Sequence, residues 1–279
     1  MSLKKLFSTV LLFILSSAAF AAGPKPEAIQ AWDRYIQLTE TRIEAQQRDR
    51  QNFLRAQPET AEQTAAFEAK LKRGEIVVQK LTRTDQGKSI EAPGALIHDW
   101  VGTAFIQGAT IKQAFSVLQE YDHHSRTYAP EVQKSKLISR NGDDFTAYLR
   151  FVKQKVITVV LDTYHQAHYG TIDATHAFSR SYTTKIAEID DPGTTHEHEK
   201  SADDEEGFMW KMNTYWRFEE RDGGLYIQCE AVTLTRNVPF GLAWMIEPFI
   251  TSIPKESLTS TMVETRRAVS DSTTSAPGH

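Results

Sequence analysis

The sequence predicts an α+β domain in which an antiparallel sheet is covered by one long C-terminal helix. Three observations predict it. Residues 133–236 hold a run of strand-like segments separated by tight-turn signals, and Phe240–Val269 reads as a long apolar helix. Within the run, Gly207–Glu220 alternates large apolar and mostly polar side chains, the period of two expected for a half-buried strand. A hairpin-linked sheet needs a cover for its apolar face, and this helix is the large apolar cover available.

The N-terminus has the pattern of a secretory signal peptide. Lys4 and Lys5 precede an apolar run, Leu6–Leu15, and Ala19-Phe20-Ala21 has the A-x-A form of a cleavage site. The apolar run is shorter than the roughly 20 residues that span a bilayer. We therefore expect residues 1–21 to be removed by cleavage near Ala21, and the mature chain to be periplasmic or secreted.

Composition limits the partners. Without the two lysines of residues 1–21, 30 of the 32 basic residues remain against 36 acidic ones, a net charge of −6. This mild acidity, without a basic stripe, argues against a nucleic-acid partner. Cys229 is the sole cysteine of the sequence, so no intramolecular disulfide can form. We expect no cofactor, and the sequence does not indicate an oligomeric state.

Residues 22–74 form an expected N-terminal helical segment, a helical hairpin. Ile29, Trp32, Ile36 and Ile43 recur at helical spacing, a break falls near Pro58, and a second helix ends at a glycine. The apolar stripe is thin. It either packs against its own domain or binds a partner protein, and the sequence leaves both interpretations open.

Residues 75–269 form the expected main domain. Its expected strands are Glu75–Arg83, Ile97–Ile106, Gln133–Ser139, Phe145–Phe151, Val156–Tyr169, Phe178–Ile189, Phe208–Glu220 and Leu225–Arg236. Asn141-Gly142-Asp143 and Asp222-Gly223-Gly224 are hairpin turn signals. Thr110 is the expected N-cap of a helix that contains Phe115 and Leu118.

Three other segments carry expectations. The acidic stretch Asp190–Glu206 reads as a solvated, mobile loop. Pro248 and Pro254 should kink or interrupt the long C-terminal helix, because proline cannot donate the helical hydrogen bond. The polar residues 270–279 are expected to be a disordered tail.

The order of elements resembles the START-like helix-grip superfamily, also called SRPBCC, of polyketide cyclase/dehydrase and lipid-transport type. The resemblance covers about residues 95–269. It rests on WVGTAFIQGATIKQAFSVLQEYDHHSRTYAPEV, which ends in Tyr128-Ala129-Pro130-Glu131-Val132, and on CEAVTLTRNVPFGLAWMIEPFITSIPKESL from Cys229 onward. It implies a bent antiparallel sheet wrapped around the C-terminal helix, with an apolar cavity between them. The N-terminal helical segment is not part of the superfamily's common pattern.

The apolar face of Gly207–Glu220 can be either solid core or the wall of that cavity. Cavity walls combine an apolar lining with a few polar groups that fix orientation. On this interpretation the ligand-binding residues are Phe208, Trp210, Met212, Thr214, Trp216, Leu149, Phe151, Met245 and Phe249.

Catalytic and metal-binding motifs are weak. The sequence has neither G-x-S-x-G nor a Gly-rich phosphate loop. His123-His124 fits a helix end, His165 and His168 fall on opposite faces of a strand, and His196-Glu197-His198 lies in the acidic loop. These spacings match no zinc pattern. We therefore assign no catalytic residue and no metal ligand.

An acid–base pair inside the cavity remains possible. His98, Asp99, Asp122 or Arg180 could supply it if their side chains point inward. The sequence favours an exported, non-catalytic binding protein for a hydrophobic small molecule such as a lipid or isoprenoid, which could contact membranes transiently. The alternatives are a cyclase- or aromatase-like enzyme that uses the same cavity, or an envelope interaction module that acts through the N-terminal helices.

Overall fold

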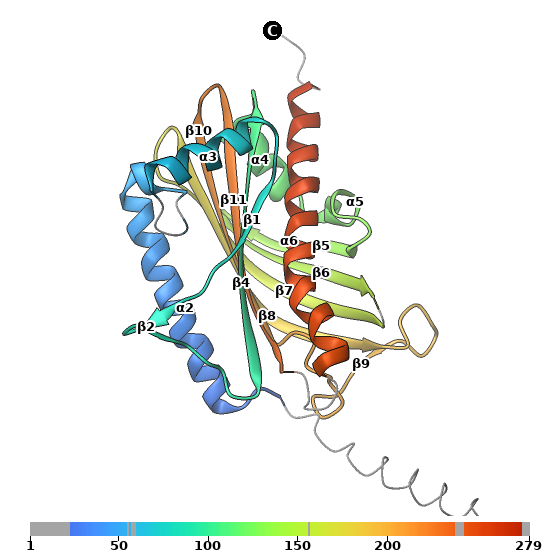
Figure 1. Cartoon of the computed structure of the whole chain (residues 1–279). Coiled ribbons are helices and arrows are strands. Elements are labelled where there is room, and N and C mark those ends of the chain that lie inside the picture. The colour runs from blue at the N-terminus through green and yellow to red at the C-terminus, as the bar shows by residue number, and fades with distance from the viewer. Residues whose placement is uncertain (1–22, 55, 57–59, 156, 238–242, 275–279) are drawn as a thin grey trace, which may run out of the picture.

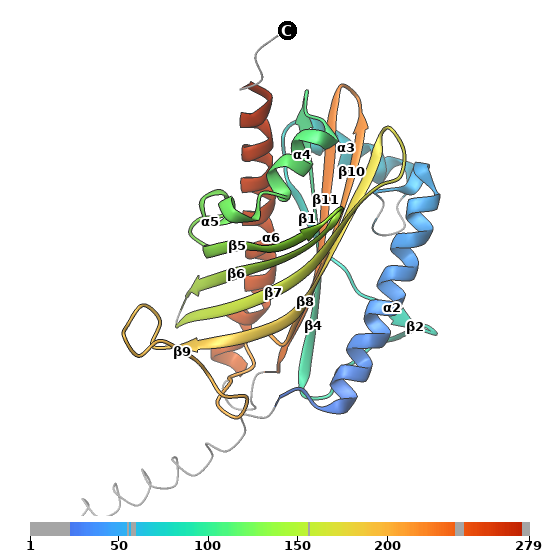
Figure 2. The same ribbon diagram turned by 180° about the vertical axis from the view of Figure 1, so that it is seen from behind.

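A computed structural model describes residues 23–54, 56, 60–155, 157–237 and 243–274, with only the backbone described for 243–251 and 274. A curved antiparallel sheet lies between the long helix α6 (Ala243–Thr274) on its concave side and the helix α2 (Pro26–Arg48) on its convex side (Figures 1 and 2). The predicted signal peptide, residues 1–21, lies outside the described residues. The predicted α+β class and helix-grip arrangement are confirmed.

The main sheet runs in the order β1-β4-β11-β10-β8-β7-β6-β5, with β9 paired to β8. Its strands are β1 Val77–Lys80, β4 Ala95–Gln107, β5 Val132–Asn141, β6 Asp144–Gln154, β7 Thr158–Thr171, β8 His176–Asp190, β9 His198–Glu199, β10 Lys211–Arg221 and β11 Gly224–Arg236. A separate small hairpin pairs β2 Thr84–Asp85 with β3 Lys88–Ser89, between the expected strands Glu75–Arg83 and Ile97–Ile106.

The expected turns close the hairpins. Gly142 and the pair Asp222 and Gly223 all have φ between 56° and 70°. That left-handed conformation suits the tight turns joining β5 to β6 and β10 to β11. The turn signals therefore fixed where these strands end.

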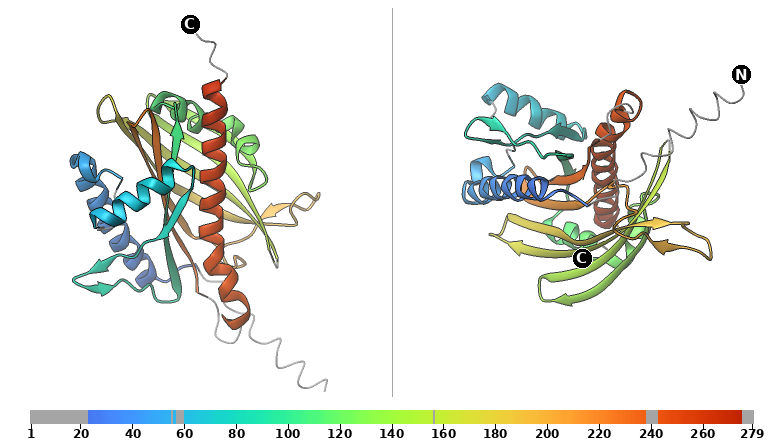
Figure 3. Two further views of the ribbon diagram at one scale, coloured as in Figure 1. Left: turned by 45° about the horizontal axis from the view of Figure 1, so that its top comes forward. Right: turned by 90° about the horizontal axis from the view of Figure 1, so that it is seen from below.

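The helix α6 packs along β4 on the concave face, as Figure 3 shows from below. At Gly102 of β4, a Cβ atom would lie 2.8 Å from Cγ of Met262. A side chain there would push the helix away, so this glycine permits the close approach. The helix is continuous through Pro254, and Figure 1 shows its N-terminal part leaning away from the axis of the rest. It also continues to Thr274, five residues into the expected disordered tail.

Three short helical elements cover one end of the concave face: α4 Ile111–Leu118, η2 Tyr121–His123 and α5 His124–Thr127. Thr110 caps α4 as predicted: its hydroxyl accepts from the backbone N–H of Gln113, and the Gln113 side chain accepts from the backbone N–H of Thr110. Phe115 of α4 makes edge-on ring contacts with Tyr169 and Phe218, and Tyr169 makes another with Phe145. These rings form a solid core beneath the helix.

The apolar stripe of α2 packs against its own domain. Trp32, Tyr35 and Ile43 are buried against Val232 and Leu234 on the convex face of the sheet. After the short η1 (Arg50–Asn52), the chain continues to α3 (Ala61–Lys72), which contacts β1 and β4. Figure 1 shows α3 turned away from the axis of α2. The stripe is therefore occupied, so a partner would have to bind elsewhere on this segment.

Candidate functional site

A cavity of about 300 Å³ lies between the concave face of the sheet and α6. Its volume is at the lower end of the ~300–1,000 Å³ typical of small-molecule sites. The apolar lining comes from strands β5, β6, β7, β10 and β11, from α4 and α6, and from the segment that precedes β10. The apolar lining residues are Leu118, Val132, Leu149, Phe151, Val152, Leu161, Phe208, Met209, Met212, Trp216, Cys229, Ala231, Ile253, Pro254 and Leu258.

Most of the predicted ligand-binding residues are brought together here. The six that line the cavity are Leu149, Phe151, Phe208, Met212, Thr214 and Trp216. The side chains of Met245 and Phe249 lie outside the described residues. That these side chains bind a ligand stays a prediction.

The prediction for Trp210 is wrong. Its side chain packs on the convex face beside Trp32, with the residues that α2 covers. The regular strand begins only at Lys211, so the alternation of faces does not extend back to Phe208 and Trp210. Met209, on the expected polar phase, lines the cavity instead.

The aromatic face of β10 is part cavity wall and part solid core. Met212 and Thr214 face the cavity, whereas Phe218 is completely buried beneath α4. Trp216 lies at the boundary, lining the cavity and stacking on Phe218 with ring centroids 6.1 Å apart. Both sequence interpretations are therefore correct, each for one half of the strand.

Two buried histidines belong to the cavity lining. The imidazole Nε2 of His124 lies 3.1 Å from the carbonyl oxygen of Leu118, which can only accept, so Nε2 carries the proton. The Nε2 of His165 lies 2.7 Å from the hydroxyl of Thr163, which itself donates to the carbonyl of Leu149 at 2.9 Å. His165 therefore also carries its proton on Nε2.

Both imidazoles are neutral at physiological pH. Burial lowers the pKa of His124 and that of His165 to about 4 in each case. A neutral imidazole protonated on Nε2 presents an acceptor at Nδ1. The His123-His124 pair was expected to be structural, yet His124 reaches the cavity. The predicted separation of His165 and His168 is correct, because His165 is buried whereas His168 pairs with Asp144 on the outer face.

Phenol groups complete the polar end of the cavity. The hydroxyl of Tyr169 donates to the carbonyl of Leu118 at 3.0 Å and lies 3.0 Å from the hydroxyl of Tyr121. The hydroxyl of Tyr128 is 3.1 Å from that of Thr265 on α6. Burial raises the pKa of Tyr121 to about 12. These phenols are neutral and held by protein partners.

One ion pair lies at the lining between β6 and α6. The ammonium of Lys153 is 2.8 Å from a carboxylate oxygen of Glu131 and 3.1 Å from the hydroxyl of Ser257. A second pair, Lys155 with Glu256 at 2.7 Å, joins the same strand end to α6. The charge of Lys153 is therefore already balanced.

The residues proposed for an inward acid–base pair do not line the cavity. Asp99 points to the convex face, Asp122 accepts from the backbone N–H of Leu137, and Arg180 is exposed. His98 is buried against Thr235, 3.1 Å from its hydroxyl, outside the lining. The register of neighbouring strands decides these positions, and no sequence signal indicated it.

The acidic loop is tied to the sheet. Glu197 accepts a hydrogen bond of 2.8 Å from Arg150, a buried residue that also binds both carboxylate oxygens of Asp162. At the loop's end, Glu188 accepts from the backbone N–H of Phe208 at 3.0 Å. Most residues of 190–206 are exposed, as expected for a solvated loop, and these contacts attach the loop to the sheet and hold Phe208 at the cavity.

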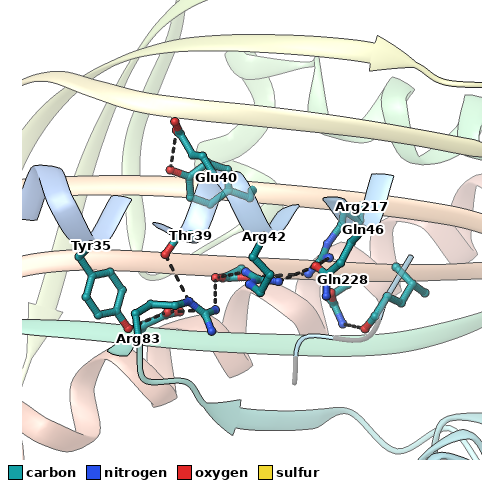
Figure 4. A network of polar contacts seen from close by, with 12 residues as sticks. Tyr35, Thr39, Glu40, Arg42, Gln46, Arg83, Arg217 and Gln228 are labelled. Atoms are coloured by element: carbon teal, nitrogen blue, oxygen red, sulfur yellow. Dashed lines mark hydrogen bonds and ion pairs between the residues drawn. The ribbon is translucent and has the colours of Figure 1, made fainter. Parts of the chain in front are cut away.

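A buried charge network occupies the convex face of β10 and β11, beneath α2 (Figure 4). Glu230 is completely buried and accepts from Arg42 at 2.6 Å and from Arg83 at 3.1 Å, while Arg217 lies 3.6 Å away. Burial alone would raise the pKa of Glu230, but the three guanidinium groups hold it below its usual value. Burial and the neighbouring Arg42 lower the pKa of Arg217 to about 9.

The network also contains Asp99, which accepts from the hydroxyl of Tyr35 at 2.9 Å. Burial and the carboxylate of Glu230 raise the pKa of Asp99. Arg217 also donates to the carbonyl of Phe53 at 2.9 Å. The sequence prediction that this phase of β10 is wettable is therefore wrong: α2 covers it, and ion pairing replaces water.

No protein-family model matches the chain, and no curated protein is similar enough in sequence to match. Several solved structures are similar in fold. A STAR-related lipid transfer protein from Xanthomonas axonopodis has TM-score 0.43 and 12% identity, over 68% of this chain and 98% of that one. Human STARD10 has TM-score 0.42 and 10% identity, over 76% and 80%. The Zhui aromatase/cyclase of a Streptomyces species has TM-score 0.43 and 11% identity, over 66% and 100%.

These similarities concern the fold alone. The curved sheet and the long helix α6 form the helix-grip arrangement that the sequence resemblance predicted. In the described part of the chain, no helix has the length and apolar character needed to cross a bilayer. Within the same residues, no group of three or more His, Cys, Asp or Glu side chains could hold a metal ion.

Proposed function

We propose that this protein is an exported binding protein that holds one hydrophobic small molecule in the cavity, without catalysis. The observation that carries the proposal is the space between Met212, Thr214 and the helix α6, in a fold whose other half is solidly packed. Burying about 200 Å² of apolar ligand surface is worth roughly 5 kcal/mol at ~25 cal/mol per Å². An apolar lining of this kind can therefore retain a ligand without any charged contact.

Export is the part of the proposal that rests on residues 1–21. The basic start, the apolar run and Ala19-Phe20-Ala21 support it. N-terminal sequencing of the protein from its native cells should give Ala22 as the first residue. An intact Met1 would contradict export by cleavage.

An enzyme that uses the same cavity is the second candidate, favoured by the convergence of His124, His165 and Tyr128. A general base works best when its pKa lies near the operating pH. The pKa of about 4 of both histidines makes them weak bases at neutral pH. Binding is therefore the better-supported function.

Two measurements test the binding function. Organic extraction and native mass spectrometry of the purified protein should reveal a bound apolar molecule. The neutral dye N-phenyl-1-naphthylamine should bind to the emptied protein, and Thr214→Phe should weaken that binding by tenfold or more, because the ring fills the cavity.

Thr184→Phe is the matched control, since Thr184 is exposed on the neighbouring strand β8. It should leave dye binding unchanged. Absence of any extracted molecule, together with equal dye binding in Thr214→Phe and the unsubstituted protein, would overturn the proposed function.

A further inference from the structure

The polar end of the cavity has a fixed hydrogen-bonding polarity. His124 and His165 both line the cavity, and both use Nε2–H to bind protein oxygen atoms, those of Leu118 and Thr163. In this tautomer Nδ1 accepts a hydrogen bond and cannot donate one. Among the described residues no protein donor to Nδ1 of His165 is found, whereas the ring of His124 also lies near the carbonyl of Val117. His165 is therefore the better-placed acceptor for a ligand donor.

The phenol groups around the two histidines do not reverse this polarity. Tyr121 and Tyr169 share a hydrogen bond, and Tyr169 donates onward to the carbonyl of Leu118. Tyr128 is engaged with Thr265 on α6. The phenols nearest the two histidines are thus already committed to protein partners.

The charge of the lining excludes an anionic head group. Among the described lining residues the one cation is Lys153, which is already 2.8 Å from Glu131. A carboxylate or phosphate buried here would lack a counter-ion, and burying an unpaired charge is far costlier than burying a hydroxyl. A neutral head group avoids this cost.

The volume limits the body of the ligand. At about 300 Å³ the cavity is at the lower end of the ~300–1,000 Å³ range of small-molecule sites. A single chain of about ten carbons with one hydroxyl is a probe suited to a site of this class. A lipid with two long acyl chains would need several times this space.

We propose that the cavity selects a compact apolar alcohol, whose hydroxyl donates to Nδ1 of His165 or His124 while its hydrocarbon body lies against Met212 and Trp216. This inference rests on the proposed binding function and adds the chemical class of the ligand. An ether of the same shape has no hydrogen to donate, and an acid is charged at neutral pH. Both are therefore weaker ligands than the alcohol.

The test compares three probes on the mature protein at pH 7.5: 1-decanol, decyl methyl ether and decanoate, each displacing N-phenyl-1-naphthylamine. Decanol should bind about 3- to 10-fold more tightly than the ether, the value of one neutral hydrogen bond. Decanoate should bind at least tenfold more weakly than decanol. His165→Phe or His124→Phe should remove the preference for decanol over the ether.

His168→Phe is the matched control, because His168 lies three residues along the same strand on the opposite face. It should keep the preference. Equal binding of all three probes, tightest binding of decanoate, or a preference that survives both cavity substitutions would overturn the alcohol assignment and leave the binding function standing. Failure of every probe to bind would instead overturn the binding function itself. The comparison on the unsubstituted protein is independent of how the variants fold.

Discussion

The two faces of β10 and β11 differ in what covers them. On the concave face, Met212, Thr214 and Ala231 border open space under α6, and the polar groups of the lining are mostly neutral. On the convex face, Arg217 and Glu230 are completely buried under α2. Along each strand, successive side chains thus point alternately toward the cavity and toward the ion network. The charged face is the more tightly closed one, so polarity in the sequence does not predict exposure here.

The largest expected effect comes from breaking the convex network. Glu230→Gln removes the carboxylate that three guanidinium groups surround and leaves their charges buried without a balance. Loss of one partner of a buried ion pair typically costs about 3–5 kcal/mol. The free energy of unfolding, from urea titration, should fall by that amount. Glu44→Gln, on the exposed side of α2, should change it by less than about 0.5 kcal/mol. Equal, small losses in both variants would show that the network contributes little to stability.

The sequence could predict the strands, the turns and a helix start because local signals determine them. Alternation marked the strands, Gly142 and the pair Asp222 and Gly223 marked turns, and Thr110 marked a helix start. Six of the nine residues predicted to bind the ligand line the cavity. The alternation of side chains along β6 and along the segment that includes β10 indicated which of them face α6.

The polar chemistry could not be predicted, because its partners are distant in the chain. Arg217 looks solvent-facing until Glu230 and Arg42 are placed beside it, and Arg42 is 188 residues from Glu230 in the sequence. His165 follows a register shift between β7 and β8, which no residue pattern revealed. The position of His124 at the cavity likewise depends on the packing of α5 against β5.

His165 on the cavity face and Asp99 on the convex face should respond to acid with opposite signs. On the cavity face, the pKa of His165 falls from 6.5 to about 4 on folding, so the unfolded chain binds the proton first as the pH is lowered. Its contribution to stability is therefore lost between about pH 6.5 and pH 4. On the convex face, the pKa of Asp99 is raised, so the folded chain keeps a proton that the unfolded chain loses above about 3.8. Acid therefore favours folding through Asp99.

Substitutions separate these contributions. His165→Phe should reduce the loss of unfolding free energy by roughly 1 kcal/mol per pH unit within the window from 6.5 to 4. Asp99→Asn should instead steepen the loss, because it removes the opposing group. Urea titrations at several pH values measure both slopes, with His168→Phe as the control. Slopes that change in the same direction in both variants would contradict the assignment of opposite signs to His165 and Asp99.

The smallest expected difference lies between two adjacent residues of β10. The hydroxyl of Tyr215 donates to Glu40 of α2 at 3.0 Å and accepts from Asn213 at 3.2 Å, so Tyr215→Phe leaves two buried partners unsatisfied. The cost should be about 1–2 kcal/mol in the free energy of unfolding. Thr214 lines the cavity, and Thr214→Val should change stability by about 0.5 kcal/mol or less. Equal costs would mean that the concave face is packed as tightly as the convex one. The cavity would then be filled rather than open. The two faces of β10 would not differ in packing at these adjacent residues.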